Sequence, residues 1–169
     1  RRSSDLNTTG TLNTASGYKS LYTATTANYN TAYGACSLAA NTTGGSNTAS
    51  GYAALKANTT GANNVASGFG ALYCNTTGPS NVAVGYQSLH RNQSGTNNTA
   101  IGDSSMWCNT TGGHNTASGA SALAANTTGS YNTATGRYAL CSNTTGNNNT
   151  AIGYCSLFSN TSGCYNLTS

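Results

Sequence analysis

The chain has 169 residues and a formal net charge of +4, and only 5% of its residues are charged. Acid–base catalysis depends on titratable side chains, yet the acidic residues are only Asp5 and Asp103 and the histidines only His90 and His114. The basic residues are scattered without forming a stripe for nucleic acid, and the short apolar runs predict no membrane span. We therefore expect no enzyme, no cofactor and no nucleic-acid partner.

A 17-residue unit repeats along the whole chain without an insertion or deletion, so residues 1–169 form a single tandem-repeat array. The consensus is N-T-T-G-x-x-N-T-A-S-G-Y-x-A-L-x-x, and positions are numbered below from its first Asn. Unbroken phase predicts that each unit advances the structure by one identical step, as in a solenoid. The units begin at Asn7, Ala24, Asn41, Asn58, Asn75, Asn92, Asn109, Asn126, Asn143 and Asn160.

The unit is too short for a pair of helices, and its Gly, Thr, Val and Ile residues favour short strands with tight turns. We expect two or three strands per coil, each of about three to five residues, such as Thr48 to Ser50 and Tyr52 to Lys56. Glycines such as Gly44 and Gly51 should turn the corners with positive φ. The predicted fold class is all-β, a parallel β-solenoid (β-helix) of about ten coils, open to assembly end to end or as a trimer.

Position one begins an N-glycosylation acceptor triplet, Asn-x-Ser/Thr, in nine of the ten units. In Asn92-Gln93-Ser94 both residues after Asn have changed, yet the acceptor pattern persists. Covalent N-linked glycans would explain how so uncharged a surface stays in solution. The alternative is a second row of stacked Asn side chains. The acceptor residues are Asn7, Asn41, Asn58, Asn75, Asn92, Asn109, Asn126, Asn143 and Asn160.

Position seven is Asn in every unit, and in all units except the last, where Asn166 starts an incidental acceptor triplet, the required hydroxyl is missing. This predicts a structural ladder in which buried amides bond to the coils above and below. This ladder comprises Asn13, Asn30, Asn47, Asn64, Asn81, Asn98, Asn115, Asn132, Asn149 and Asn166. Position fifteen should form the apolar core ladder, filled out by the Ala at position nine. The core ladder comprises Leu21, Leu38, Leu55, Leu72, Leu89, Met106, Leu123, Leu140 and Leu157.

Aromatic residues recur at positions twelve and sixteen, where they either stack on sugars or pack between faces or chains, and we favour packing. The six cysteines lack the paired spacing of zinc sites and indicate structural disulfides or inert thiols in an oxidising compartment; a bridge between Cys141 and Cys155 is one option. His90 and His114 are expected to be exposed polar residues.

Two segments, Asn98 to Gly102 (N-T-A-I-G) and Asn149 to Tyr154 (N-T-A-I-G-Y), resemble repeats in the heads of trimeric autotransporter adhesins and in some phage and viral tail fibres. Those families use such segments in β-rolls or trimeric β-helices. The resemblance implies the same kind of fold and a place on a cell or virion surface. It also implies a surface carbohydrate or a host receptor as a partner.

Each coil contributes one Leu and a few small residues to the core, so stacking should continue over many units or several chains should share it. The leading hypothesis is a structural subunit of an extracellular, N-glycosylated fibre whose partner is itself. The alternatives are the shaft or head of an adhesin or tail fibre, and an ice-binding solenoid. Val65 and Val82 interrupt the hydroxyl array that ice binding would use.

Overall fold

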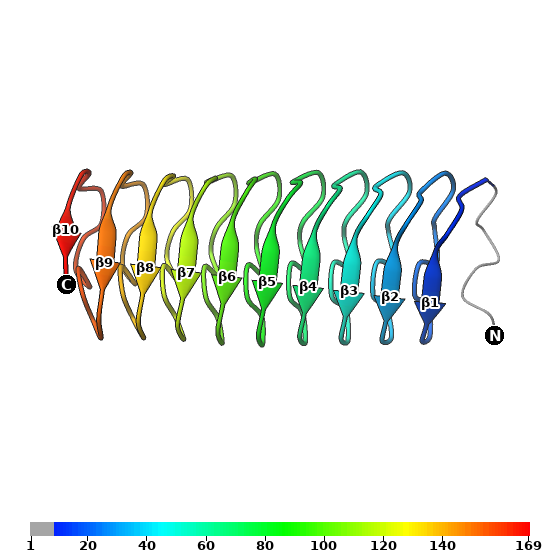
Figure 1. The fold of residues 1–169 in the computed structure, drawn as a ribbon, viewed down its shortest axis with the longest axis horizontal. Coiled ribbons are helices and arrows are strands. Elements are labelled where there is room, and N and C mark those ends of the chain that lie inside the picture. The colour runs from blue at the N-terminus through cyan, green and yellow to red at the C-terminus, as the bar shows by residue number, and fades with distance from the viewer. Residues whose placement is uncertain (1–8) are drawn as a thin grey trace.

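The computed structural model describes residues 9–169, which form a rod of stacked coils (Figure 1). Each coil contributes one short strand to a single parallel sheet that runs along the rod, and the strands lie in chain order from β1 to β10. The predicted all-β parallel solenoid is confirmed. The strands are β1 (Thr14–Ser16), β2 (Thr31–Tyr33), β3 (Thr48–Ser50), β4 (Val65–Ser67), β5 (Val82–Val84), β6 (Thr99–Ile101), β7 (Thr116–Ser118), β8 (Thr133–Thr135), β9 (Thr150–Ile152) and β10 (Leu167–Thr168).

The pairing register is constant along the sheet. Thr14 pairs with Thr31, and Thr31 pairs with Thr48, so each partner lies 17 residues further along the chain. The same step continues to the last pair, in which Leu167 lies beside Thr150. Identical positions of successive units therefore stand in columns along the rod axis, about 4.8 Å apart.

The strand has one residue facing inward and two facing outward. In β3, Ala49 is fully buried, whereas Thr48 and Ser50 are exposed. This alternation follows from the two-residue period of a strand. The small Ala at position nine allows the sheet to approach the opposite wall of the coil closely.

The coil contains one strand, and the second strand predicted at Tyr52 to Lys56 is wrong. Ala53 and Leu55 in this segment have φ angles of 56° and 51°, in the left-handed region. Residues in that region bend the chain instead of extending it. The resulting turn carries Leu55 into the interior, where it is fully buried.

The glycines at positions four and eleven of the repeat have different roles. Gly51 has a φ of 133°, as predicted for a corner. Gly44 does not lie in the left-handed region, so that part of the prediction is wrong. A Cβ on Gly44 would instead lie 2.6 Å from Oδ1 of Asn41 and 2.9 Å from Nδ2 of Asn58. Such a Cβ would also clash with the main-chain carbonyl oxygen of Gly61, so position four is Gly because the backbone of the next coil and two Asn side chains approach it.

The core is a narrow column of Leu and Ala side chains. Position fifteen is fully buried from Leu38 to Leu140, with Met106 in the same column, and the position-nine Ala residues from Ala32 to Ala151 are also fully buried. Leu21 is 3% exposed, and Leu157 packs against the cluster while remaining partly exposed. Within residues 9–169, no helix is long and apolar enough to cross a membrane.

Candidate functional site

The position-seven asparagines form a ladder through the interior. The main-chain N–H of Asn64 donates to Oδ1 of Asn47 at 3.0 Å, and its Nδ2 donates to Gly78 O at 3.0 Å. Oδ1 of Asn64 in turn accepts the main-chain N–H of Asn81 at 2.9 Å. Each amide therefore bonds across a coil boundary as both donor and acceptor. The column runs from Asn13 to Asn166; Asn30 to Asn149 are fully buried, and its two end members are partly exposed.

The position-one asparagines form a second ladder. Nδ2 of Asn58 donates to Oδ1 of Asn41 at 2.8 Å and to Gly61 O at 2.9 Å. Oδ1 of Asn58 accepts from Nδ2 of Asn75 at 2.8 Å. The members from Asn41 to Asn143 are fully buried, and Asn160 in the last coil is partly exposed.

The carbonyl at position four joins the two ladders. Gly61 O accepts from Nδ2 of Asn58 in its own coil and from Nδ2 of Asn47 in the preceding coil, both at 2.9 Å. Sequence reasoning missed this role. The sequence does contain a signal for it. In the second unit both position one and position four are changed, to Ala24 and Ala27, which indicates that the Asn and the Gly depend on one another.

The acceptor triplets begin inside the fold. An N-linked glycan is attached to Nδ2, and in the coils from Asn41 to Asn143 this atom is buried and hydrogen-bonded to a neighbouring amide or carbonyl. A glycan there and the ladder exclude one another, so the geometry favours the alternative of a second Asn ladder. Asn160 also donates to Gly163 O and to Oδ1 of Asn143. Asn7 lies outside the described residues.

Aromatic rings stack on one another along the rod. At position twelve, the centroid of Phe69 lies 5.2 Å from that of Tyr52 and 5.4 Å from that of Tyr86, with interplanar angles of 18° and 15°. At position sixteen, the centroid of His90 lies 5.1 Å from that of Tyr73 and 5.7 Å from that of Trp107. Most of the predicted aromatic stripe is therefore occupied by packing between neighbouring coils.

His90 is not a freely exposed polar residue. Its ring is partly buried between Tyr73 and Trp107, and within the described part of the chain its Nδ1 has no hydrogen-bond partner. Burial, together with the charge of Arg91, lowers the pKa of His90. This shift favours the neutral imidazole, and the ring takes part in the stack as a flat surface. His114 is exposed as predicted, and its ring stacks on Tyr131 at 4.9 Å.

All six cysteines are free thiols, and the optional bridge between Cys141 and Cys155 does not form. Burial raises the pKa of Cys74, and burial together with the neighbouring Cys155 raises that of Cys141. A raised pKa lowers the thiolate fraction and hence the reactivity. The inert-thiol option fits these two residues.

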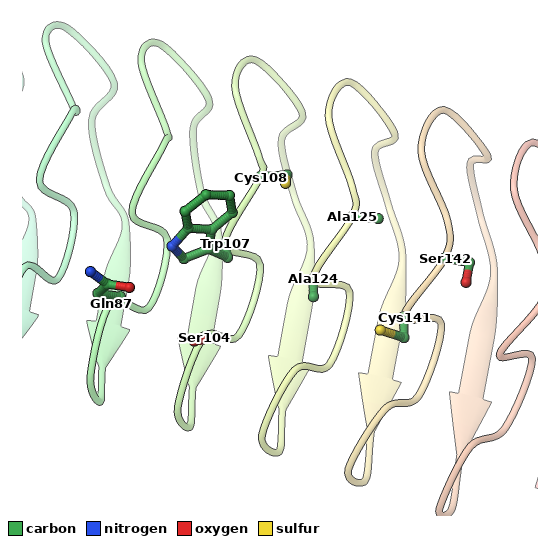
Figure 2. Close-up of a pocket in the computed structure, with 8 residues that line it drawn as sticks. All are labelled: Gln87, Ser104, Trp107, Cys108, Ala124, Ala125, Cys141 and Ser142. Carbon is green, nitrogen blue, oxygen red and sulfur yellow. The ribbon is translucent and has the colours of Figure 1, made fainter.

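One groove opens on the side of the rod, beside Trp107 (Figure 2). It has a volume of about 480 Å³. Its lining comes from four successive coils at positions thirteen, sixteen and seventeen. The walls around the indole are small: Cys108, Ala124, Ala125 and Cys141. Its neutral polar side chains are Gln87, Ser104 and Ser142.

Residues 9–169 contain no cluster of three or more His, Cys, Asp or Glu side chains placed to hold a metal ion. Comparison with known proteins gives no match, whether to a protein-family model, to a curated protein or to a solved structure. The proposals about function therefore rest on the two Asn ladders, the aromatic stacks and the groove beside Trp107.

Proposed function

We propose that this chain is a structural rod, a segment of an extracellular fibre that is built by stacking β-solenoid coils. The observation that carries the proposal is where the hydrogen-bond partners of the buried Asn amides lie. Both Asn ladders contain hydrogen bonds that run along the rod axis, from one coil to the next. Such bonds stabilise stacking itself and do not shape a pocket.

The same geometry supports a proposal of self-association. The coils offer their neighbours a nearly constant set of N–H groups, carbonyls and Asn amides, because the register is constant, although Ala24 replaces the position-one Asn in one unit. An end coil of such an array would offer this set to a coil of a second chain, as an unpaired strand edge does. We propose the chain itself as the main partner.

A glycan coat is not part of this proposal, because the described ladder buries most of the acceptor amides. Burying charged groups is costly, and a rod with 5% charged residues avoids that cost at coil-to-coil contacts. The low charge, which suggested a coat from the sequence, also suits a surface that is covered by other chains.

Negative-stain electron microscopy of native material tests the proposal. We expect long, unbranched filaments whose width matches a single rod or a small bundle of rods. Discrete monomers after gentle extraction would count strongly against a fibre.

A second candidate is the shaft or head of an adhesin or tail fibre that binds a host surface. The favouring observation is the N-T-A-I-G segment, which forms β6 with Thr99 and Ile101 facing outward. This function requires a knob or an anchor domain next to the repeats in the full-length gene. Sequencing of that gene distinguishes the two candidates.

Ice binding has less support. The outward strand positions would have to present regular hydroxyl pairs, but Val65, Val82 and Val84 occupy them in β4 and β5. Tyr33 and Ile101 break the array in β2 and β6.

A further inference from the structure

The column at position sixteen contains a gap between rings. Tyr73, His90 and Trp107 stack in three successive coils, but the next two coils carry Ala124 and Cys141 at the same position. Phe158 restores an aromatic ring only in the coil after these. His90 and Arg91, which contact the indole, both come from the preceding coil, and the following coil has no ring to cover it.

The gap coincides with the groove beside Trp107 in Figure 2. Its volume of about 480 Å³ falls in the range of small-molecule pockets. Two side chains of the preceding coil hold the indole, since the Arg91 guanidinium lies 4.3 Å from its centroid and the His90 ring 5.7 Å. A platform that is already ordered loses little entropy when a ligand binds.

We propose that this groove binds a neutral sugar, with one pyranose ring lying against Trp107. The C–H face of a pyranose packs on an indole, while its hydroxyls need neutral donors and acceptors at the rim. Gln87 and Ser142 supply an amide and a hydroxyl there, and Ser104 Oγ, which donates to Oδ1 of Asp103 at 2.7 Å, can accept. No charged side chain lines this groove, so the site favours an uncharged sugar over a sugar acid.

Other aromatic rings of the two stacks are either covered on both sides or lie away from the groove. Phe69 and His90 each have a stacked ring on both neighbouring coils. Tyr86 ends the position-twelve stack, but the next coil places Asp103 at that position, and Tyr86 does not line the groove. Trp107, by contrast, lies at the end of a stack and beside a groove lined by small residues. The inference is independent of whether the rod assembles into a fibre.

Trp107 is the only tryptophan in the chain, so its fluorescence reports directly on the site. The experiment titrates the full chain with methyl β-glucopyranoside and methyl β-galactopyranoside. We expect a saturable change of intensity with a blue shift for at least one of them, because the sugar displaces water from the indole. The groove is open to solvent, so half-saturation should need millimolar sugar.

Two variants with the same added ring localise the effect. Ala124→Tyr fills the gap with a side chain that position sixteen already accepts at Tyr73, and it should abolish the response. Ala39→Tyr adds the same ring at position sixteen of a distant coil and should leave the response unchanged. Thermal unfolding of both variants checks that they fold.

A third variant tests the polar rim without filling the groove. Gln87→Ala places at position thirteen a residue that this position already holds as Ala53, at a φ of 56°. Losing one hydrogen bond should raise the half-saturating sugar concentration by about five- to tenfold.

Three results would overturn the proposal. The first is the absence of any saturable response to both sugars. The second is an equal response in folded Ala124→Tyr, which would place binding elsewhere. The third is a response to a planar aromatic probe, nicotinamide, that is lost in Ala124→Tyr while neither sugar has an effect. That result would assign the groove to aromatic rings instead.

Discussion

At the scale of single residues, the coil boundary requires a side chain that is both donor and acceptor on a short stem. Asn meets this requirement, because Asn64 donates through Nδ2 and accepts through Oδ1 within 3.0 Å of partners in the following coil. An ionised Asp has no donor, and a Gln amide stands one carbon further from the backbone. The identity of positions one and seven therefore follows from coil spacing.

The acceptor triplet at Asn58 allows its two interpretations to be separated. Asn58→Ala removes three buried hydrogen bonds and should lower the free energy of unfolding by about 2–4 kcal/mol. Thr60→Ala destroys the acceptor triplet but leaves Asn58 in place, and the exposed Thr60 side chain should be worth less than about 0.5 kcal/mol. Chemical denaturation measures both values.

Intact-mass spectrometry before and after glycosidase treatment completes this comparison. A mass close to 17.0 kDa is expected for the folded protein. A glycosidase-sensitive mass that falls by one glycan in Thr60→Ala, together with an unfolding free energy unaffected by Asn58→Ala, would contradict the ladder as the role of position one.

At the scale of the coil, the sequence predicts the strand better than the turns. The alternation at Thr48 to Ser50 identifies β3 correctly, since inward Ala and outward hydroxyls follow the period of a strand. The segment from Tyr52 to Lys56 has no comparable local signal. Non-glycine residues rarely adopt positive φ, so Leu55 at 51° could not be recognised from its residue type. Burial in the core column stabilises that conformation.

Two glycines in one coil provide a matched test of the corner. A Cβ on Gly51 would lie 2.8 Å from the carbonyl carbon of Gly68, and its φ of 133° disfavours any L-residue. Gly51→Ala should therefore lower the free energy of unfolding by more than about 3 kcal/mol.

The control for this substitution is Gly45→Ala. Its added Cβ would meet only Asn28 O at 3.3 Å, and its φ is not positive, so an effect below about 1 kcal/mol is expected. Thermal or chemical denaturation compares the two variants. Equal destabilisation would show that position eleven is not a specially constrained corner.

At the scale of the whole molecule, the repeat period predicts the architecture. The consensus sequence does not predict the groove. A constant step of 17 residues is sufficient to infer stacked coils and parallel pairing. The groove arises at position sixteen, where Ala124 and Cys141 follow three successive coils that carry a ring at that position. The neutral His90 within a stack likewise depends on its neighbours along the axis. The groove and the stack are recognised only when the residues at one repeat position are compared from unit to unit along the rod.

The constant register also determines how the rod should respond to changes of length. Each coil contacts only the coils before and after it, as in other repeat proteins, so one unit can be removed if the phase is kept. Deleting residues 58–74 joins Ala57 to Asn75 and preserves every column. Deleting residues 58–75 joins Ala57 to Thr76 and leaves one coil a residue short.

Thermal unfolding of these two deletion variants, followed by circular dichroism, tests most directly whether identical axial stacking holds the fold together. The in-phase variant should keep the β spectrum and a single cooperative transition within a few degrees of the parent. The out-of-phase variant should unfold about 10 °C lower or more, since several buried amides lose partners at the broken step. Equal midpoints for the two variants would contradict a rod that is stabilised by in-register ladders.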